Sequence, residues 1–322
     1  MLANYHSAFL KYLDSQIPND PPKGLYEPVE YIMQLGGKRI RPILALLSAE
    51  AVSGNYKDAL AVSMAVETFH NFSLVHDDIM DEAPLRRTQP TVHDKWDINT
   101  GILSGDVMLV MAYQYLTNYP APLSVALSML FSETARKVCE GQQYDMEFPN
   151  QKDVTESEYL HMICYKTAVL LGCSLQMGAM VGGLSREESQ VFYDFGIELG
   201  LAFQLQDDYL DAFGDPKTFG KQVGGDIIEN KKTLLYLLAK EGANEAQKDQ
   251  LNSLFHSQTQ NTSDKIEIVK SLFVATKADQ KIQERIAQYT QKALEKVNGF
   301  PISDEKKNEF RTFANALMER KL

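Results

Sequence analysis

The sequence predicts an all-α protein, and three observations support this fold class. Apolar residues recur at three- and four-residue spacing along most of the 322 residues, as they do on the buried face of a helix. Alternating β-branched runs closed by Asn-Gly or Asp-Gly turns, which would indicate hairpins, are absent from the sequence. The composition is 44% hydrophobic and 23% charged, close to that of an ordinary globular chain that can bury a sizeable core.

The predicted helices follow one another along the whole chain. Their apolar patterns cover Ala8–Leu13, Val29–Leu35, Pro42–Val52, Ala59–Met80, Leu103–Leu116, Leu123–Met146, Tyr159–Met180, Val191–Phe213, Leu234–Leu238, Ile266–Val297 and Phe310–Leu317. Loops are predicted at Pro18–Lys23, Pro84–Asn99, Pro120–Pro122, Pro149–Thr155 and Gly214–Asn230. None of these loops looks like a long interdomain linker, so we expect residues 1–322 to form a single all-α domain.

Charge and cysteine usage restrict the class of protein further. A net charge of −11 argues against a general nucleic-acid binder, so no nucleic-acid partner is expected. Cys139, Cys164 and Cys173 lack metal or disulfide spacing, and no signal peptide is visible, which favours a cytoplasmic protein. The uncharged stretch Thr167–Leu184 contains polar residues and several glycines, so we expect a buried helix and no transmembrane segment.

An Asp-Asp-x-x-Asp motif stands at the end of two predicted helices, in FSLVHDDIMD (72–81) and FQLQDDYLD (203–211). Asp77 and Asp81 are one turn apart and share a helix face, whereas Asp78 lies about 100° around, where it can support them. Asp207, Asp208 and Asp211 repeat this spacing. Acids at a helix C-terminus oppose the helix dipole, and clustered carboxylates repel one another, so both motifs call for a cation.

Carboxylates without cysteine suit Mg²⁺, which completes its shell with water and substrate phosphates. The expected ligand is therefore a polyphosphate or diphosphate held between the two helix ends. Four basic groups can balance its remaining charge: Gly36–Pro42, Arg86–Arg87, Lys166–Thr167 and Gly220–Lys232. A P-loop is absent from the sequence, and no nucleophile with a paired base stands out, so nucleotide hydrolysis and covalent catalysis are disfavoured.

The residues that precede the two motifs on their helices are largely apolar. They are Val66, Phe69, Phe72 and Ser73 on one helix and Leu199, Phe203 and Leu205 on the other. A diphosphate site above an apolar cavity fits an isoprenoid diphosphate, which has a charged head and an apolar tail.

Taken in order, the motifs make the chain similar to the trans-isoprenyl diphosphate synthase (polyprenyl synthetase) family, of the short-chain type. They are GGKRIRP, DDIMD with LRR, GQQYD, KT, FQLQDDYLD, and GKQVGGDI with NKKT. The resemblance covers most of the chain, and it departs from the family at Thr88, where a glycine is usual. It implies an isoprenoid synthase fold, a barrel of long helices around a deep central cavity, usually in a homodimer.

The resemblance also implies a role for each matched residue. Asp77 and Asp81 would bind two Mg²⁺ and Asp207 a third, with support from Asp78, Asp208 and Asp211. The allylic diphosphate would be held by Arg86, Lys166, Lys221 and Lys231, and isopentenyl diphosphate by Lys38, Arg41, His70 and Arg87, with Gly37 allowing a close backbone approach. Gln142, Asp145, Thr167 and Gln204 would line the reacting region, and Arg320 and Lys321 would close over it.

The implied mechanism relies on electrostatics. Three Mg²⁺ ions and the basic residues would stabilise the departing diphosphate, which leaves an allylic cation. The double bond of isopentenyl diphosphate would attack this cation, and a proton would then be lost to the diphosphate. Water has to be excluded, because it would quench the cation.

Product length in this family is limited by bulk that precedes the first motif. On an ideal helix, Phe69 lies about 80° and Ser73 about 40° from Asp77, whereas Phe72 lies about 140° away. Helix geometry therefore favours Phe69 as the floor of the cavity that holds the growing product, whereas the family pattern favours Phe72. Either floor implies a C15 or C20 product. C20 is favoured because the first motif lacks the two-residue insertion of bacterial farnesyl diphosphate synthases and Ser73 is not the aromatic residue of eukaryotic ones, a combination that resembles geranylgeranyl diphosphate synthases.

Two other functions share parts of this pattern. A class I terpene cyclase has the same fold and a first Asp-rich motif, but its second motif differs from DDYLD. An inactive regulatory subunit of a prenyl synthase would be expected to have lost an aspartate motif or its basic partners, and this chain has both.

Overall fold

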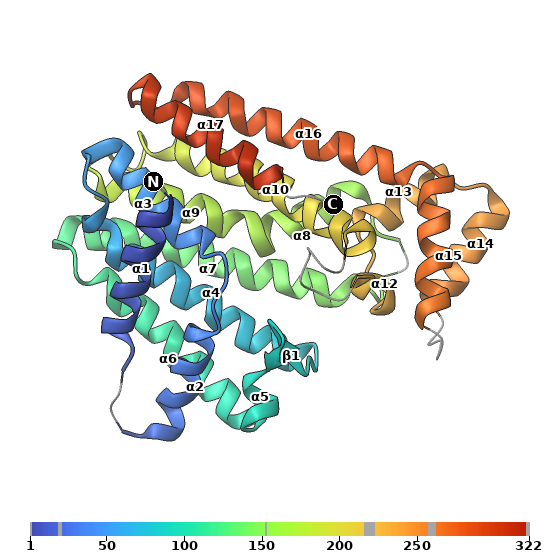
Figure 1. The fold of residues 1–322 in the computed structure, drawn as a ribbon, viewed down its shortest axis with the longest axis horizontal. Coiled ribbons are helices and arrows are strands. Elements are labelled where there is room, and N and C mark those ends of the chain that lie inside the picture. Colours follow the sequence, from blue (N-terminus) through green and yellow to red (C-terminus); the bar gives the residue numbers. More distant parts are fainter. Residues whose placement is uncertain (1, 19–20, 152, 216–222, 257–261, 320–322) are drawn as a thin grey trace. The chain divides into compact units, whose positions relative to one another are not determined.

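Helices dominate the computed structural model, which describes residues 2–18, 21–151, 153–215, 223–256 and 262–319 (Figure 1). This content confirms the predicted all-α fold class. The first half of the chain contains α1 (Leu2–Gln16), α2 (Lys23–Gln34), α3 (Ile40–Ser53), α4 (Leu60–Met80), α5 (Val92–Lys95), α6 (Ile98–Leu116) and α7 (Ala121–Glu147).

The second half contains α8 (Glu156–Ile163), α9 (Val169–Val181), α10 (Gln190–Phe213), α12 (Gly225–Ile228), α13 (Leu234–Gly242), α14 (Glu245–His256), α15 (Thr262–Ala275), α16 (Ala278–Lys296) and α17 (Asp304–Met318). A π-helical turn, η2 (Cys164–Ala168), joins α8 to α9. Short 3₁₀ turns lie at Tyr56–Ala59 and Val297–Gly299.

The loop predicted at Pro84–Asn99 holds more structure than expected, namely α5 and a small hairpin of β1 (Leu85–Arg86) and β2 (Gln89–Pro90). Its turn places Arg87 at φ 52° and Thr88 at φ 64°. A β-branched residue is strained in this left-handed region, where glycine is at ease. Thr88, where the family usually has glycine, therefore stands at a position whose left-handed backbone favours glycine. The hairpin turn nevertheless forms with threonine there.

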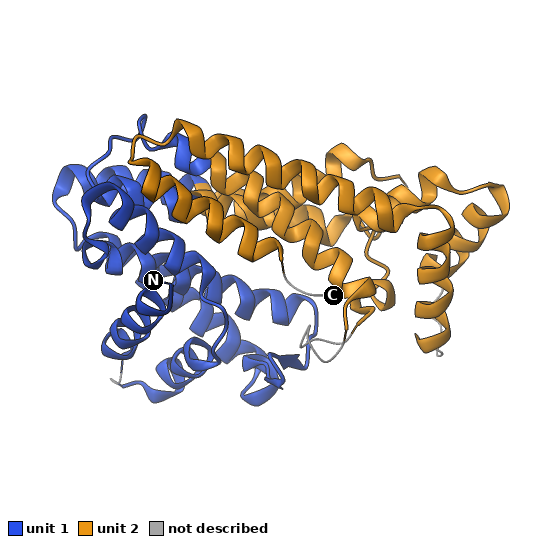
Figure 2. Cartoon of the chain, turned by 45° about the horizontal axis from the view of Figure 1, so that its top comes forward, with its two compact units in different colours: residues 1–133, 173–193 blue, residues 134–172, 194–322 orange. Residues whose placement is uncertain are grey.

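The chain groups into two compact units, drawn in different colours in Figure 2. Unit 1 consists of residues 1–133 and 173–193, and unit 2 of residues 134–172 and 194–322. The boundaries fall within α7, α9 and α10. The expected single domain stays a prediction, and each unit is described here by itself.

In unit 1, α4 packs against α1, α2, α3, α5 and α6. Every residue from 61 to 69 is buried, because this stretch is apolar or small on all sides apart from Glu67 and Thr68. A helix that is apolar all round belongs in a core. The first aspartate motif thus stands at the end of a helix whose first half is enclosed on all sides.

In unit 2, α13 packs against α8, α14, α15 and α16. The core around it includes Leu205, Leu235, Tyr236, Phe255 and Phe273. The second aspartate motif lies in the last two turns of α10, whose Leu205 and Leu210 belong to this same core.

The uncharged stretch from Thr167 is a buried helix, as expected. Every residue from 167 to 180 is buried. In unit 1, a Cβ added at Gly178 would stand 2.1 Å from the carbonyl oxygen of Ala45, so α3 and α9 touch backbone to backbone there. Among the described helices, none has both the length and the apolar character needed to cross a membrane.

Candidate active site

The first aspartate motif closes α4. The backbone N–H of Asp81 donates to the carbonyl of Asp77 (2.8 Å), which places these two residues one turn apart, as predicted. Asp77 is half-buried and Asp81 is exposed, whereas Asp78 is only 1% exposed. The outer two aspartates of the motif are therefore accessible to a ligand, and the middle one faces the protein.

Asp78 is held by Arg86 from strand β1. One carboxylate oxygen, Oδ1, accepts from Nε (3.0 Å) and from Nη2 (2.5 Å) of the guanidinium. Burial raises the pKa of Asp78, and the hydrogen bonds from Arg86 only partly oppose this shift. The other oxygen, Oδ2, is buried and has no hydrogen-bond partner among the described residues. Asp78 thus fixes the arginine that follows the motif.

The GGKRIRP segment meets the second arginine of the hairpin. Gly37 has φ 118°, and a Cβ built on it would lie 2.8 Å from Cζ of Arg87. Arg87 also donates to the carbonyl of Gly36. The family resemblance assigns Gly37 to a close approach by substrate, and in this structure the group that approaches closely is the Arg87 guanidinium.

Two residues predicted to bind the same diphosphate, Arg41 and His70, touch each other. Nη1 of Arg41 lies 3.2 Å from Nε2 of His70. Burial lowers the pKa of His70 well below its usual value, and the charge of Arg41 lowers it further, as do those of Arg87, Arg86 and Arg39. A neutral His70 can accept from Arg41 through Nε2. Lys38, from the same predicted group, is exposed.

A buried ion pair that sequence reasoning missed lies behind this basic cluster. Nη1 of Arg39 is 2.5 Å from Oε1 of Glu67, and both side chains are at most 3% exposed. Arg39 also donates to the carbonyl of Met33, and Asn71 donates to Glu67 (3.2 Å). Glu67 is the single acid in the apolar part of α4, and that isolation was the signal that could have revealed it.

The residues predicted to limit product length lie side by side on α4. Phe69 is 1% exposed and packs against Phe72 and Phe131, with ring centroids 5.4 and 5.3 Å away. Phe72 is half-buried and lies edge-on to the ring of His76 (4.8 Å). Ser73 is also half-buried, and its hydroxyl donates to the carbonyl of His70 (2.9 Å).

The second aspartate motif repeats the arrangement of the first. Asp207 and Asp211 are half-buried, whereas the middle residue, Asp208, is 4% exposed. Asp208 accepts hydrogen bonds from the hydroxyl of Tyr159 and from Nε2 of Gln204 (3.0 Å). Burial and the charge of Asp226 raise the pKa of Asp208 well above its usual value. Asp211 accepts from the N–H of Asp226 (3.1 Å) and so joins α10 to α12.

Lys166 and Thr167 lie in the π-helical turn η2. Two glycines allow neighbouring helices to approach this turn: a Cβ at Gly141 would stand 2.2 Å from the backbone nitrogen of Lys166, and one at Gly200 would stand 2.6 Å from Ala168. Single π-helical turns occur frequently at functional sites. Here the turn places Nζ of Lys166 2.6 Å from Asp145, and the hydroxyl of Thr167 3.0 Å from Oε1 of Gln204.

A polar pocket of about 100 Å³ collects most of the site residues predicted for unit 2. It is lined by Asp145, Phe148, Pro149, Tyr159, Met162, Ile163, Lys166, Thr167, Gln204, Asp208, Asp226, Lys231, Lys232 and Thr233. Although burial acts against it, the charges of Asp226 and Glu229 raise the pKa of Lys231 above its usual value, so this lysine is cationic.

Three predicted site residues, Lys221, Arg320 and Lys321, lie outside the described residues. Gln142 is 8% exposed, and its side-chain nitrogen and oxygen have no hydrogen-bond partner within the described part of the chain. A buried amide without partners costs free energy unless a ligand or water bonds to it.

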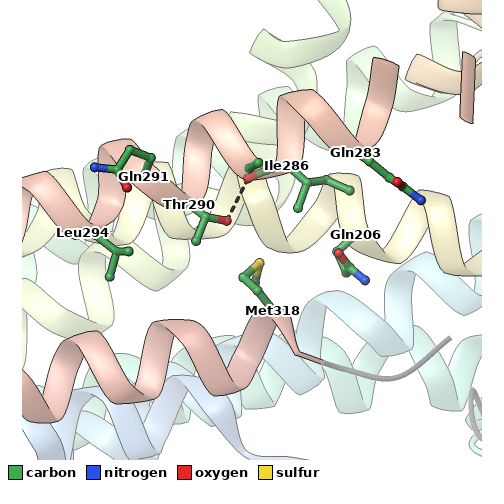
Figure 3. Close-up of a pocket in the computed structure, with 8 residues that line it drawn as sticks. Gln206, Gln283, Ile286, Thr290, Gln291, Leu294 and Met318 are labelled. Carbon is green, nitrogen blue, oxygen red and sulfur yellow. Dashed lines mark hydrogen bonds between the residues drawn. The ribbon is translucent and has the colours of Figure 1, made fainter. Parts of the chain in front are cut away.

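A second, more apolar pocket of about 350 Å³ in unit 2 contains none of the predicted site residues. Figure 3 shows Gln283, Ile286, Thr290, Gln291 and Leu294 along α16, with Gln206 of α10 and Met318 of α17 turned toward the same space. The hydroxyl of Thr290 is satisfied by the carbonyl of Ile286 (2.7 Å). This pocket offers neither an acid nor a base for the chemistry.

Comparisons with known proteins identify the family of the chain. The polyprenyl synthetase family is matched by residues 22–272. The chain is 41% identical over 258 residues to a short chain isoprenyl diphosphate synthase of Methanothermobacter thermautotrophicus, covering 80% of this chain and 79% of that protein.

Two solved structures extend the likeness to the fold. The crystal structure of a geranylgeranyl pyrophosphate synthase matches with a TM-score of 0.96 and 49% identity, covering 100% of this chain and 99% of that one. A geranylgeranyl pyrophosphate synthase from Corynebacterium glutamicum, complexed with isoprenyl diphosphate and magnesium, matches with a TM-score of 0.87 and 25% identity over 99% and 98% of the two chains. The chain belongs to the polyprenyl synthetase family and is a prenyltransferase.

Proposed function

We propose that this prenyltransferase condenses isopentenyl diphosphate with an allylic diphosphate, with the help of Mg²⁺, to give a short all-trans prenyl diphosphate. The observation that carries the proposal is the presence of a cationic group in each unit. In unit 1, the cations are Arg41, which contacts His70, and Arg87, which lies against Gly37; in unit 2, they are Lys166 and Lys231, which line the polar pocket. A reaction between two diphosphates needs two such groups, whereas a cyclase needs one.

The accessible aspartates fit Mg²⁺ by their chemistry. Within the described ranges, no three His, Cys, Asp or Glu side chains come together as a complete metal cage. Mg²⁺ does not need one, because it is usually bound by one or two carboxylates together with water and substrate phosphates. Asp77 and Asp81 would hold two ions and Asp207 a third, while Asp78, Asp208 and Asp211 support the motifs from inside the protein.

Mg²⁺, when bound, neutralises the diphosphate that leaves the allylic substrate. The protein's own residues perform the other tasks. Arg86, Lys166 and Lys231 bind the allylic diphosphate, and Lys221 completes this group. Lys38, Arg41, His70 and Arg87 bind isopentenyl diphosphate, so that its double bond attacks C1 of the allylic cation. The proton lost from the new chain passes to the departing diphosphate, whose anionic oxygens accept it.

The chain length of the product is limited, with C20 favoured over C15, by Phe69, Phe72 and Ser73. Support comes from their place on α4, about one to two turns before Asp77, and from the bulk of the two packed phenyl rings. The geranylgeranyl pyrophosphate synthases among the similar structures support the same length.

We also propose that the protein is a homodimer. In unit 1, large apolar side chains are exposed on α6 (Ile102, Leu103 and Val110) and on α7 (Val125 and Met129), each at least 44% accessible. The two helices are neighbours, since the hydroxyl of Tyr113 lies 3.1 Å from that of Ser132. A group of exposed apolar side chains on adjacent helices marks an interaction surface, and a second copy would cover it.

Incubation with Mg²⁺, labelled isopentenyl diphosphate and a C5, C10 or C15 allylic diphosphate tests the proposed reaction. A labelled, longer diphosphate is expected with at least one primer. If all three primers fail to give one, the synthase assignment is wrong. Sedimentation of the same sample tests the dimer separately.

A further inference from the structure

Tyr159 is a buried tyrosine at the polar pocket to which neither the family resemblance nor the proposed reaction gives a role. It lies in the first turn of α8 and is 3% exposed. A capping box fixes the start of this helix, because Thr155 and Glu158 each bond to the backbone N–H of the other (2.8 and 3.2 Å). The tyrosine hydroxyl donates to Oδ2 of Asp208.

Asp208 connects this tyrosine to the reacting region. Its other oxygen, Oδ1, accepts from Nε2 of Gln204, one turn earlier on α10 (3.0 Å). A carboxylate only accepts hydrogen bonds, so Gln204 has to turn its NH₂ group toward Asp208. The amide oxygen of Gln204 then faces Thr167, whose hydroxyl donates to it (3.0 Å).

This order of donors and acceptors determines whether the Thr167 hydroxyl presents its lone pairs or its proton to the pocket. Because its only hydroxyl proton is directed at Gln204, the lone pairs of Oγ1 are left toward the pocket that Lys166 also lines. If the amide of Gln204 were reversed, Thr167 would have to accept from it and its proton would be directed elsewhere. The direction of both hydrogen bonds therefore depends on Asp208 keeping Oδ1 opposite the amide of Gln204.

We propose that Tyr159 is a positioning residue for the condensation: by fixing Asp208, it sets the direction of the hydrogen bonds between Gln204 and Thr167. The inference rests on the proposed function, which places Thr167 and Gln204 beside the reacting atoms. The hydroxyl of Tyr159 is directed at Asp208, so its effect on the reaction passes through that residue. The buried network is fully satisfied only when all four side chains are in place, and such networks hold one arrangement.

A purely structural role for Tyr159 can be separated from this one by a matched variant. Tyr159 and Tyr236 belong to the same core of unit 2 and are 3% and 2% exposed. The hydroxyl of Tyr236 also makes a side-chain hydrogen bond, to Asn252 (3.3 Å), and within the described residues it makes none to the aspartate motif. Tyr159→Phe and Tyr236→Phe each remove one buried hydroxyl and leave the ring in place.

The first experiment measures kcat and both KM values for the wild type, Tyr159→Phe, Tyr236→Phe, Thr167→Val and the double variant Tyr159→Phe/Thr167→Val. Tyr159→Phe is expected to lower kcat roughly tenfold, the effect of losing one hydrogen bond to a charged group. The KM for isopentenyl diphosphate stays unchanged, since none of its proposed binding residues belongs to this hydrogen-bond network. Tyr236→Phe keeps the wild-type kcat. The double variant is no slower than Thr167→Val alone, because Tyr159 acts through Thr167.

Two kinetic results would overturn the proposal. One is a Tyr159→Phe enzyme whose kcat equals that of Tyr236→Phe, which would leave Tyr159 a structural residue. The other is a double variant whose loss is the product of the two single losses, which would mean that Tyr159 does not act through Thr167.

A second measurement needs no turnover and so remains decisive if the wild type makes no product. In protein with ¹⁵N-labelled glutamine, the side-chain amide signal of Gln204 is identified by its loss in Gln204→Leu. We expect this signal to shift or broaden in Tyr159→Phe and to be unchanged in Tyr236→Phe. An unchanged signal in both variants would refute the proposal, whereas an inactive wild type with the expected shift would refute only the proposed function.

Discussion

The buried carboxylate of Asp78 accepts two hydrogen bonds from Arg86, from Nε at 3.0 Å and from Nη2 at 2.5 Å. In the second motif, Asp208 likewise accepts from two protein groups, Tyr159 and Gln204. Each Asp-Asp-x-x-Asp motif therefore buries its middle aspartate, which binds the protein and orders the groups around it. The outer aspartates are more accessible, although Asp211 also accepts from the N–H of Asp226.

This division predicts different effects for neighbouring aspartates. Asp77→Asn removes a proposed metal ligand, so the Mg²⁺ concentration needed for half-maximal rate is expected to rise tenfold or more. Asp78→Asn leaves that concentration unchanged but destabilises the fold by about 1–3 kcal/mol, because a charged hydrogen bond to Arg86 is lost. Mg²⁺ titration of the rate and urea unfolding check the two effects. Equal shifts in Mg²⁺ dependence for both variants would contradict the assignment.

Gly37→Ala is expected to weaken the binding of isopentenyl diphosphate selectively. The added Cβ would stand 2.8 Å from Cζ of Arg87, so the guanidinium has to move. We expect the KM for isopentenyl diphosphate to rise about tenfold, the effect of about 1.4 kcal/mol of lost binding, with little change in the KM for the allylic diphosphate.

Gly183→Ala provides the matched control for this variant. Gly183 has a similar φ of 113°, but a Cβ built there meets nothing within 4 Å. It therefore reports the cost of backbone strain without displacement of a side chain. A Gly183→Ala enzyme with the same rise in KM would show that strain, and not Arg87, is responsible.

His70 predicts a pH dependence of stability. Because burial and the surrounding arginines lower its pKa in the folded protein, the unfolded chain binds a proton more readily than the folded one. Stability associated with His70 is therefore complete above the ordinary histidine pKa of about 6.5 and is lost as the pH falls below it, by up to about 1.4 kcal/mol per pH unit. The difference in unfolding free energy between the wild type and His70→Gln, measured from pH 7.5 to pH 5, isolates this contribution. A difference that does not vary with pH would rule it out.

Phe72→Ala and Phe69→Ala are expected to differ in both product and stability. Phe69 is fully enclosed, so its truncation costs about 3–5 kcal/mol, as for a phenylalanine in a core. Phe72 is half-buried, and Phe72→Ala is expected to lose less stability while extending the main product by at least one isoprene unit. Product lengths from geranyl and farnesyl diphosphate provide the readout. If neither variant lengthens the product, the floor does not lie on this part of α4.

The sequence predicted the fold class correctly, and it nominated most residues of the candidate site, because both rest on local patterns. The helix period marked α4 and α10, and the spacing of Asp77, Asp78 and Asp81 already placed the middle aspartate on a different side of the helix. Burial of Asp78 agrees with that geometry.

What the sequence did not predict depends on partners far along the chain. Tyr159 and Asp208 are 49 residues apart, and Arg39 and Glu67 are 28 apart. A lone tyrosine in a helical pattern is indistinguishable from ordinary core until its neighbour is known. The hairpin at Leu85–Pro90 was missed for a different reason, because its turn places Arg87 and Thr88 in the left-handed region without a glycine.

The central claim is that the enzyme joins two diphosphates, and the stoichiometry of the reaction tests it most directly. With farnesyl diphosphate, Mg²⁺ and labelled isopentenyl diphosphate, each C20 diphosphate formed is predicted to consume one isopentenyl diphosphate and to release one inorganic pyrophosphate. Chelation of Mg²⁺ should stop both. Release of pyrophosphate at the same rate when isopentenyl diphosphate is omitted would contradict the account, because it would mean that the allylic substrate is cyclised or hydrolysed instead of extended.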